Sequence, residues 1–192
     1  MADDIGSLLE AVRRGDERAL DLLFSSVYDE LRRLAQRSRR RHSGHITLTT
    51  TALVHEAYIK LASGKPGTWK TRSHFFATAA KVFRHVLANY AERRSAAKRG
   101  GRARPLPFDE LLFMTDPQIV EAVAIHQALD RLDVEDPRMS RVVECRVFGG
   151  MSVSETAEAL GVSEATVKRD WQVGAAWLYT QLRTNSYEIH HG

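Results

Sequence analysis

Apolar residues recur every three or four positions through the first half of the chain, which is the period of an amphipathic helix. One stripe stops near Gly15 and consists of Ile5, Leu8, Leu9 and Val12. The next stripe consists of Leu20, Leu23, Phe24, Val27, Tyr28, Leu31 and Leu34. It leads into the basic cluster RSRRRHSGH at residues 37–45, where we expect the helix to end. The pattern therefore predicts two helices before residue 45.

Two further helices are predicted before residue 100. The threonines at residues 49–51 offer hydroxyl groups that can cap a short helix. Its inward face consists of Leu53, Val54, Ala57, Tyr58 and Leu61, and its outward face consists of His55, Glu56, Ile59 and Lys60. The glycines and proline of SGKPGTWKTR, residues 63–72, indicate a loop, after which Ser73 can cap the next helix. The stripe of that helix consists of Phe76, Ala79, Ala80, Phe83, Val86, Leu87 and Tyr90. We expect these four helices to surround one core.

A change of composition separates the two halves of the chain. The sequence GGRARPLPFDELLFMTDP, residues 100–117, combines two glycines and three prolines with no sustained period, as linkers do. Between residues 105 and 136 there are eight acidic residues and the single base Arg131. No stretch shows convincing strand alternation. The predicted fold class is therefore all-α, with two small helical domains joined by a flexible linker.

The second half contains two helical patterns around one glycine. After Pro137 a helix runs to a pair of glycines at residues 149–150. Ser152 and Glu155 then have the S-x-x-E spacing of a capping box, and Gly161 supplies a left-handed turn residue. The inward residues of the following helix are Val167, Trp171, Ala175, Leu178 and Leu182. This spacing indicates a helix-turn-helix, although helical hairpins with a glycine corner also serve as plain packing units.

The second helix of such a motif places its N-terminal side chains in the major groove of DNA. The outward residues that could contact bases or phosphates are Glu164, Thr166, Lys168, Arg169 and Gln172. Lysine and arginine suit phosphates and guanine edges, and glutamine can read adenine.

The charge of the chain is distributed unevenly. The formal net charge is +4 overall, but it is +9 over residues 1–100 and −5 over residues 101–192. A basic half suggests a polyanionic partner, because phosphate contacts supply most non-specific affinity for nucleic acids. A basic solvated surface without a partner is the alternative.

Composition narrows the class of protein. Hydrophobic residues make up 43% of the chain, and no apolar run approaches the roughly 18–20 residues of a membrane-spanning helix. The acidic, amphipathic N-terminus does not resemble a secretory signal. Cys145 is the only cysteine, so no internal disulfide or thiolate zinc cage can form, which fits a reducing cytosol. We therefore expect a cytoplasmic protein without membrane contact.

Catalytic and metal-binding motifs are missing from the sequence. There is no phosphate loop, no G-x-S-x-G and no convergent pair of acids, and Cys145 is expected to be a packed thiol. The run HEAYI has Ile59 where a zinc protease would need its second histidine. We therefore expect neither an enzyme nor a bound metal or cofactor.

Three segments together resemble a known family. Residues 132–182, including SRVVECRVFGGMSVSETAEALGVSEATVKRDWQVGAAWL, resemble region 4 of a bacterial sigma factor. TALVHEAYIKL at residues 51–61 resembles its polymerase-binding helix, and the helix ending VFRHVLANYAERRSAAKR resembles its promoter-melting helix. With the linker, the resemblance covers nearly the whole chain. The layout is similar to that of the extracytoplasmic-function (ECF) subfamily of the sigma-70 family.

The resemblance implies a role for each segment. Residues 1–99 would be sigma region 2, residues 100–117 the linker, residues 118–185 region 4, and residues 186–192 a tail. His55, Glu56, Ile59 and Lys60 would dock on the coiled-coil clamp of core RNA polymerase. The residues that would face the minus-10 promoter element are Trp69, Arg84, His85, Asn89, Arg93, Arg94, Lys98 and Arg99. The outward residues of the helix-turn-helix would read the minus-35 element, and an anti-sigma factor is a possible further partner.

Opening a promoter requires holding an unstacked base, which favours a stacking surface beside basic residues. We expect that surface in the loop at residues 64–72, where Trp69 lies, followed by His74 and Phe75. The acidic linker would mimic the backbone of RNA in a polymerase channel, or act only as a disordered spacer.

The chain departs from the family pattern at Asp170, Gln172 and Val173, where many relatives carry a basic residue. This departure leaves the base read by each residue open. The alternative function is a helix-turn-helix repressor or activator that binds DNA without polymerase, but it leaves the basic N-terminal half without a purpose.

Overall fold

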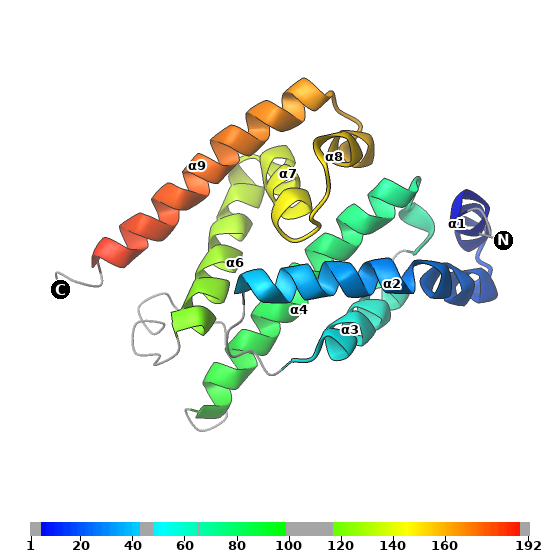
Figure 1. Ribbon diagram of the computed structural model, residues 1–192, viewed down its shortest axis with the longest axis horizontal. Helices are drawn as coiled ribbons and strands as arrows, with labels where there is room; N and C mark the ends of the chain where they lie inside the picture. The colour runs from blue at the N-terminus through cyan, green and yellow to red at the C-terminus, as the bar shows by residue number, and fades with distance from the viewer. Residues whose placement is uncertain (1–4, 43–47, 65, 99–116, 189–192) are drawn as a thin grey trace.

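The computed structural model describes residues 5–42, 48–64, 66–98 and 117–188, which contain helices and no strand. The helices are α1 (Ile5–Arg13), α2 (Glu17–His42), α3 (Thr50–Ser63), the 3-10 helix η1 (Pro66–Thr68), α4 (Arg72–Lys98), α6 (Pro117–Glu135), α7 (Pro137–Val147), α8 (Val153–Leu160) and α9 (Glu164–Glu188). Figure 1 shows their arrangement. The predicted all-α class is confirmed over these residues. None of these helices is long and apolar enough to span a bilayer.

Helices α1 to α4 form the N-terminal unit (residues 5–98). Helices α2, α3 and α4 pack against one another, and α1 packs on α2 at one end (Figure 1). Their cores include Leu23, Val27, Leu53, Phe83 and Leu87, as the hydrophobic spacing predicts. The helix starts are also set locally, because Thr49 Oγ1 accepts a hydrogen bond from Ala52 N at 3.1 Å at the start of α3. The prediction of four helices around a shared core is confirmed.

Two details of this unit differ from the prediction. Thr71, and not Ser73, caps α4, because Thr71 Oγ1 accepts from His74 N at 3.1 Å while Ser73 lies inside the helix. Helix α2, in contrast, ends at His42 inside the basic cluster, as expected. Tyr28 was expected to face inward, but it is 41% exposed.

Helices α6 to α9 form the C-terminal unit (residues 117–188). Asp136 caps α7, since its Oδ1 accepts from Met139 N at 2.9 Å. The predicted capping box starts α8, where Ser152 Oγ accepts from Glu155 N at 3.1 Å and Ser152 N donates to Glu155 Oε2 at 2.7 Å. Gly161 ends α8 with φ of 66°, the left-handed conformation that glycine adopts without strain. The helix-turn-helix of α8 and α9 is therefore present.

Helix α9 is longer than its hydrophobic stripe suggested. It begins at Glu164 and reaches Glu188, so it includes the first part of the predicted tail at residues 186–192. Val167 and Leu178 are buried, as predicted. Figure 1 shows the N-terminal end of α9 next to α8, and the remainder of the helix running along α6 and α7.

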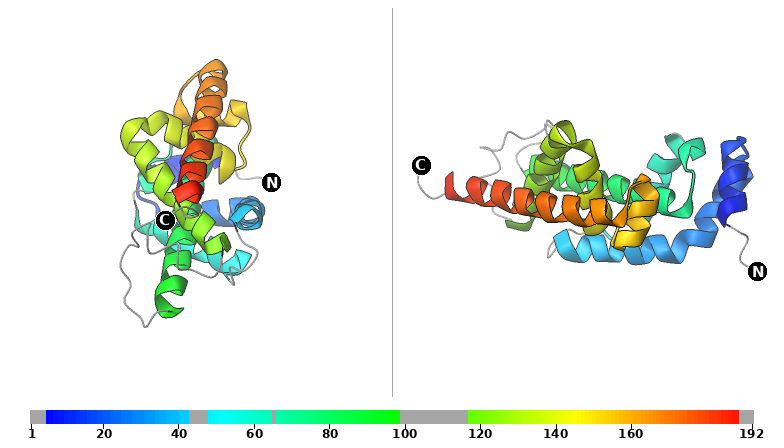
Figure 2. Two further views of the ribbon diagram at one scale, coloured as in Figure 1. Left: turned by 90° about the vertical axis from the view of Figure 1, so that its left-hand side faces the viewer. Right: turned by 90° about the horizontal axis from the view of Figure 1, so that it is seen from above.

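The two units pack against each other along α4, which contacts α6, α7 and α8 (Figures 1 and 2). Cys145 and Met151 belong to the apolar core of the N-terminal unit, and Ala80 of α4 belongs to an apolar cluster of the C-terminal unit. We call this contact the interdomain interface and the arrangement as a whole the closed arrangement. The linker predicted at residues 100–117 lies outside the described residues up to Pro117, where α6 begins.

Candidate nucleic-acid interface

The N-terminal turns of α9 present the predicted minus-35 residues to solvent. The side chains of Lys168 and Arg169 are each 64% exposed, and Glu164 and Gln172 are also exposed. Glu164 lies one turn before Lys168, and their charged groups are 3.8 Å apart. Thr166 is half-buried, and its hydroxyl lies 2.9 Å from that of Ser163 at the cap. The structure therefore gathers all five predicted residues at one end of one helix, accessible to a partner.

Asp170 explains one departure from the family pattern. Its side chain is only 3% exposed, and its Oδ2 accepts from Arg138 Nε of α7 at 2.7 Å. A carboxylate here faces the interior of the helix-turn-helix and ties α9 to α7. Asp170 is thus a packing residue, whereas Gln172 and Val173 stay on the outside of α9.

The predicted minus-10 residues on α4 have different surroundings. The Arg84 side chain is 1% exposed because α6 and α7 cover it. Its Nε lies 2.8 Å from Glu144 Oε1, and its Nη1 lies 2.8 Å from Asp130 Oδ1. His85 and Asn89 are half-buried. Arg84 was expected to face the minus-10 element, but in the closed arrangement α6 and α7 bury its side chain and Nη1 donates to Asp130.

The remaining minus-10 predictions fall at the C-terminal end of α4. Arg93 is exposed. Arg94 and Lys98 lie within α4, but their side chains are outside the described part, and Arg99 lies outside the described residues altogether.

Trp69 is a core residue and not part of an exposed loop surface. It is 2% exposed, and its ring packs edge-to-face on Phe75 with the centroids 5.0 Å apart. Phe75 is itself 0% exposed. This corrects the expectation that Trp69 offers a stacking face to a base: the loop around it is polar and glycine-rich in sequence, but the indole is buried in the core of the N-terminal unit.

The histidine in the interdomain interface is held in its neutral form. Arg84 can only donate, so Nδ1 of His126, 2.8 Å from Arg84 Nη1, accepts. Burial, the Arg84 guanidinium and His85 lower the pKa of His126 to about 4, against the opposing effect of Asp130. Burial raises the pKa of Glu144, and the guanidinium of Arg84 partly offsets this effect.

The outward face of α3 is exposed as predicted. His55, Glu56, Ile59 and Lys60 all face solvent, and Ile59 is 47% exposed, which is unusual for an isoleucine. A groove of about 490 Å³ runs beside this face, between α2 and α3. It is lined by Asp21, Phe24, Ser25, Tyr28, Thr51, Val54, His55 and Tyr58.

Sequence reasoning missed the α2 side of this groove. Tyr58 donates from its hydroxyl to Asp21 Oδ1 at 2.8 Å, and this hydrogen bond raises the pKa of Tyr58. Tyr28 was assigned to the core because it fits the apolar stripe of α2, and only the packing shows that it borders the groove.

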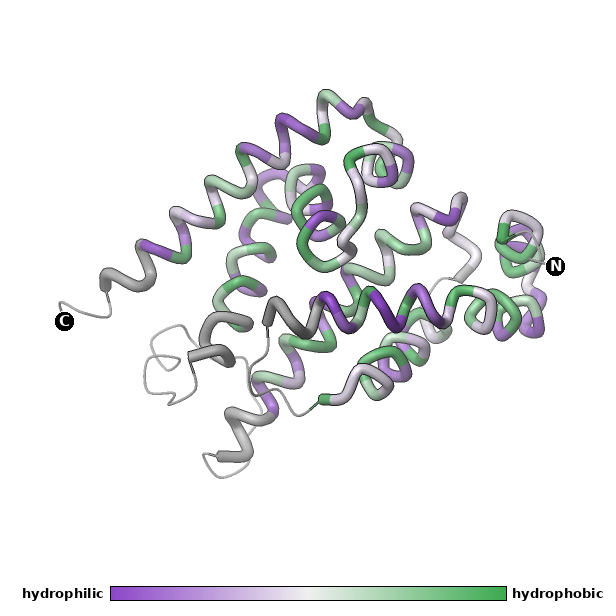
Figure 3. Tube along the Cα trace, viewed as in Figure 1, coloured by the Kyte–Doolittle hydropathy of each residue, from purple (hydrophilic) through white to green (hydrophobic). Residues whose placement is uncertain are grey.

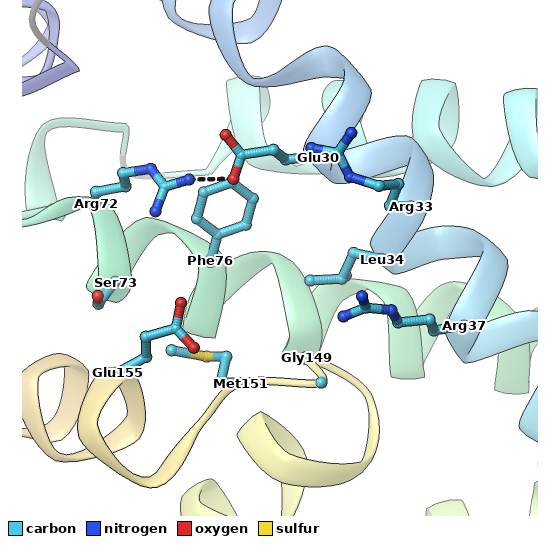
Figure 4. A pocket seen from close by; sticks show the side chains of 11 residues that line it. Glu30, Arg33, Leu34, Arg37, Arg72, Ser73, Phe76, Gly149, Met151 and Glu155 are labelled. Atoms are coloured by element: carbon cyan, nitrogen blue, oxygen red, sulfur yellow. Dashed lines mark hydrogen bonds and ion pairs between the residues drawn. The ribbon is translucent and has the colours of Figure 1, made fainter.

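A second hollow, of about 240 Å³, lies on the interdomain interface and is lined by both units (Figure 4). Arg33 and Arg37 of α2 reach it from one side, and Gly149 and Met151 from the other. Arg72 pairs with Glu30 at its edge. Figure 3 shows that the middle of α2, which supplies these arginines, is strongly hydrophilic. No sequence pattern indicates that these distant segments lie close together.

Two observations on the described residues concern metal ligands and the thiol. No group of three or more metal-ligating side chains occurs in that part of the chain. Cys145 is buried, and burial raises the pKa of its thiol to about 12, which keeps the thiol protonated and unreactive.

The described residues contain an exposed helix-turn-helix, a motif that many DNA-binding proteins use. The model of the ECF sigma factor family matches residues 2–184, and the chain belongs to this family. The chain matches no curated protein and no solved structure significantly. It is therefore a sigma factor that acts in transcription initiation, with RNA polymerase and promoter DNA as its partners.

Proposed function

We propose that this sigma factor binds core RNA polymerase through the outward face of α3, reads the minus-35 element with the N-terminal turns of α9, and opens the minus-10 element with α4. The observation that carries the docking assignment is the exposed face of His55, Glu56, Ile59 and Lys60 beside the groove between α2 and α3. An exposed isoleucine next to a partly apolar groove is a surface that a protein partner would cover.

Charge and shape support the two DNA assignments. Lys168 and Arg169 project from the start of α9, where helix-turn-helix proteins contact bases and phosphates. Helix α4 supplies the groups proposed for the minus-10 element. Two of them, Arg84 and Arg93, are basic, and two, His85 and Asn89, are polar. Arg93 is available in the closed arrangement, and Arg84 becomes available only if the C-terminal unit moves away.

The proposal is tested by runoff transcription with bacterial core RNA polymerase on fragments of the source genome. We expect discrete start sites that depend on the protein. Glu56→Arg with Lys60→Glu should weaken polymerase binding in a pull-down at least tenfold, because both charges on the docking face are reversed. Glu10→Arg with Arg14→Glu is the matched control, a charge swap at the same spacing on the exposed side of the α1 segment.

The outcomes separate the candidate functions. Equal polymerase binding by both swapped proteins would remove the docking assignment. A protein that shifts DNA but directs no transcript with core polymerase would instead be a repressor or activator.

A further inference from the structure

We propose that Arg138 of α7 is a further DNA-binding residue, and that the buried carboxylate of Asp170 positions its guanidinium group for a phosphate beside the minus-35 element. The proposal rests on the proposed function of α9 and adds a contact from a helix outside the helix-turn-helix. It also gives the packing of Asp170 a consequence for DNA binding.

The carboxylate of Asp170 lies between two guanidinium groups. Its Oδ2 accepts from Arg138 Nε at 2.7 Å, and its Oδ1 lies 3.4 Å from both Nε and Nη2 of Arg169. The Asp170 side chain is 3% exposed, whereas the side chains of Arg138 and Arg169 are 48% and 64% exposed. The carboxylate is therefore beneath the surface, and the two guanidinium groups that it pairs with are at the surface.

The guanidinium group of Arg138 can bind a second anion while it stays paired. Arginine carries N–H donors on Nε, Nη1 and Nη2. Arg138 uses Nε for Asp170, and its Nη atoms make no hydrogen bond to the part of the chain that the structure describes. A phosphate group suits these outer donors, because its oxygens match the planar fork of arginine.

Close packing of α7 on α9 fixes the place of Arg138. A Cβ on Gly174 of α9 would lie 2.7 Å from Cγ2 of Val143 and 3.0 Å from Cγ of Met139, so the two helices approach this closely because residue 174 is glycine. Met139 follows Arg138 in the first turn of α7. The backbone at Arg138 therefore has a fixed position beside α9, and the hydrogen bond of its Nε fixes the side chain as well.

The position of Arg138 suits a phosphate better than a base. Helix-turn-helix proteins place the start of their second helix in the major groove, while an adjoining helix crosses the sugar-phosphate backbone. Arg169, which is proposed to contact DNA, and Arg138 share the same carboxylate, so Arg138 lies within one side chain of the proposed DNA surface. Because Arg138 comes from α7 and not from α9, we expect it to meet the backbone at the edge of the groove.

The first turns of α9 carry few positive charges for a DNA-binding surface. Over residues 164–174 the only basic residues are Lys168 and Arg169. The ammonium group of Lys168 also lies 3.8 Å from the carboxylate of Glu164. Arg138 adds a third positive charge at this end of the C-terminal unit, and such charges supply much of the affinity for DNA.

The test measures binding of the full chain to two duplexes, one with the minus-35 element of a promoter mapped by runoff transcription and one with the same bases scrambled. Arg138→Gln keeps an N–H donor for Asp170 but removes the charge. We expect both duplexes to bind roughly three- to tenfold more weakly, and the slope of log affinity against log salt to fall by about 1. Arg32→Gln, the same substitution at an exposed position of α2, is the matched control and should change neither quantity.

Arg138→Lys separates the loss of charge from a structural defect. Lysine keeps the positive charge but lacks the planar group that can pair with Asp170 and a phosphate together. We therefore expect the salt slope of the wild type, with an affinity between those of the wild type and Arg138→Gln. Equal slopes for the lysine and glutamine variants would overturn the phosphate contact, because a purely structural defect does not depend on the charge of the new residue.

Asp170→Asn tests the positioning role by the sign of its effect. The amide has the size of the carboxylate but offers one acceptor oxygen in place of two, so it cannot hold both guanidinium groups. Removal of a negative charge near DNA would by itself strengthen binding. We expect the opposite, an affinity several-fold below that of the wild type with the helical content unchanged in circular dichroism. Tighter binding would overturn the positioning role.

The outcomes also separate this proposal from the proposed function. If Arg138→Gln binds like the wild type while Lys168→Ala with Arg169→Ala binds more weakly, only the Arg138 contact is overturned. If the wild type binds the minus-35 duplex no better than the scrambled duplex, the proposed role of α9 fails, and the contact from Arg138 fails with it.

Discussion

Helices α9 and α4 both carry basic residues that are assigned to promoter DNA, yet their surroundings are opposite. Lys168 and Arg169 of α9 stand in solvent with side chains 64% exposed, whereas the Arg84 side chain of α4 is 1% exposed and paired with two carboxylates. In sequence, both helices carry basic residues among the apolar residues of a helical stripe. The comparison teaches that a charged face identifies where a partner could bind and not whether that face is available.

The largest effect on this comparison is expected from a substitution in the core that supports α4. Trp69→Ala should lower the free energy of unfolding by about 3–5 kcal/mol, because it removes a buried indole that packs on Phe75. Thermal unfolding followed by circular dichroism measures the change.

Two controls define the role of Trp69. Lys70→Ala, at the exposed neighbouring position, should have little effect on unfolding. Trp69→Phe should fall between that control and Trp69→Ala. A Trp69→Ala protein as stable as wild type would contradict the core position and return the indole to a functional surface.

Acid should favour separation of the two units, which would expose α4 to solvent as α9 is exposed. The pKa of His126 is about 4 in the closed arrangement and rises towards 6.5 once Arg84, His85 and the burying helices move away. Above about pH 6.5, His126 is mostly neutral in both states, so it does not change the free-energy difference between them. As the pH falls from 6.5 towards 4, the separated state gains a proton that the closed state refuses, so closure weakens by at most about 3 kcal/mol.

The distance between labels on the two units, measured from pH 7.5 to pH 5, checks this expectation. His126→Asn keeps a polar group beside Arg84 but cannot titrate, and it should remove most of the pH dependence. The same acid response in both proteins would assign the effect to other groups.

The open surface of α9 should respond to charge removal without regard to the closed arrangement. Lys168→Ala with Arg169→Ala should weaken binding to minus-35 duplex roughly tenfold and reduce the slope of log affinity against log salt by about 2. Electrophoretic mobility shifts at several salt concentrations measure both quantities. Arg32→Ala with Arg131→Ala removes the same charge from exposed positions on α2 and α6 and should leave the slope nearly unchanged.

The smallest effect is expected in the support of the recognition helix. Ser152→Ala removes the capping box of α8 and should cost about 1 kcal/mol of stability, with a matching small loss in minus-35 affinity. Ser154→Ala, two residues further on and exposed, is the control for helix propensity. Equal stability of the two variants would show that the cap contributes nothing measurable.

The sequence predicts the local structure of this chain well, because local chemistry sets it. The capping box of Ser152 and Glu155, the turn at Gly161 and the exposed face of His55 and Lys60 are read from short-range spacing, and the structure has all of them. The error at Ser73 also has a local reason, since Thr71 offers an equivalent hydroxyl two residues earlier.

Contacts between distant segments are what the sequence hides. Arg84 and Glu144 are sixty residues apart, and no spacing rule relates them. Trp69 lies in a glycine-containing loop sequence that reads as exposed, but tertiary packing buries it against Phe75. Asp170 reads as a missing basic contact until Arg138 is seen beside it.

Because the Arg84–Glu144 pair is buried, the ionic strength of the solution affects this pair less than it affects contacts with DNA. Mobile ions screen exposed charges but hardly reach a pair whose side chains are 1% and 2% exposed. Contacts to DNA phosphates, in contrast, weaken steeply with salt because binding releases condensed counterions. The two partners that compete for the same guanidinium thus respond unequally to the medium, and a rise in salt concentration favours the protein's own carboxylates over the promoter.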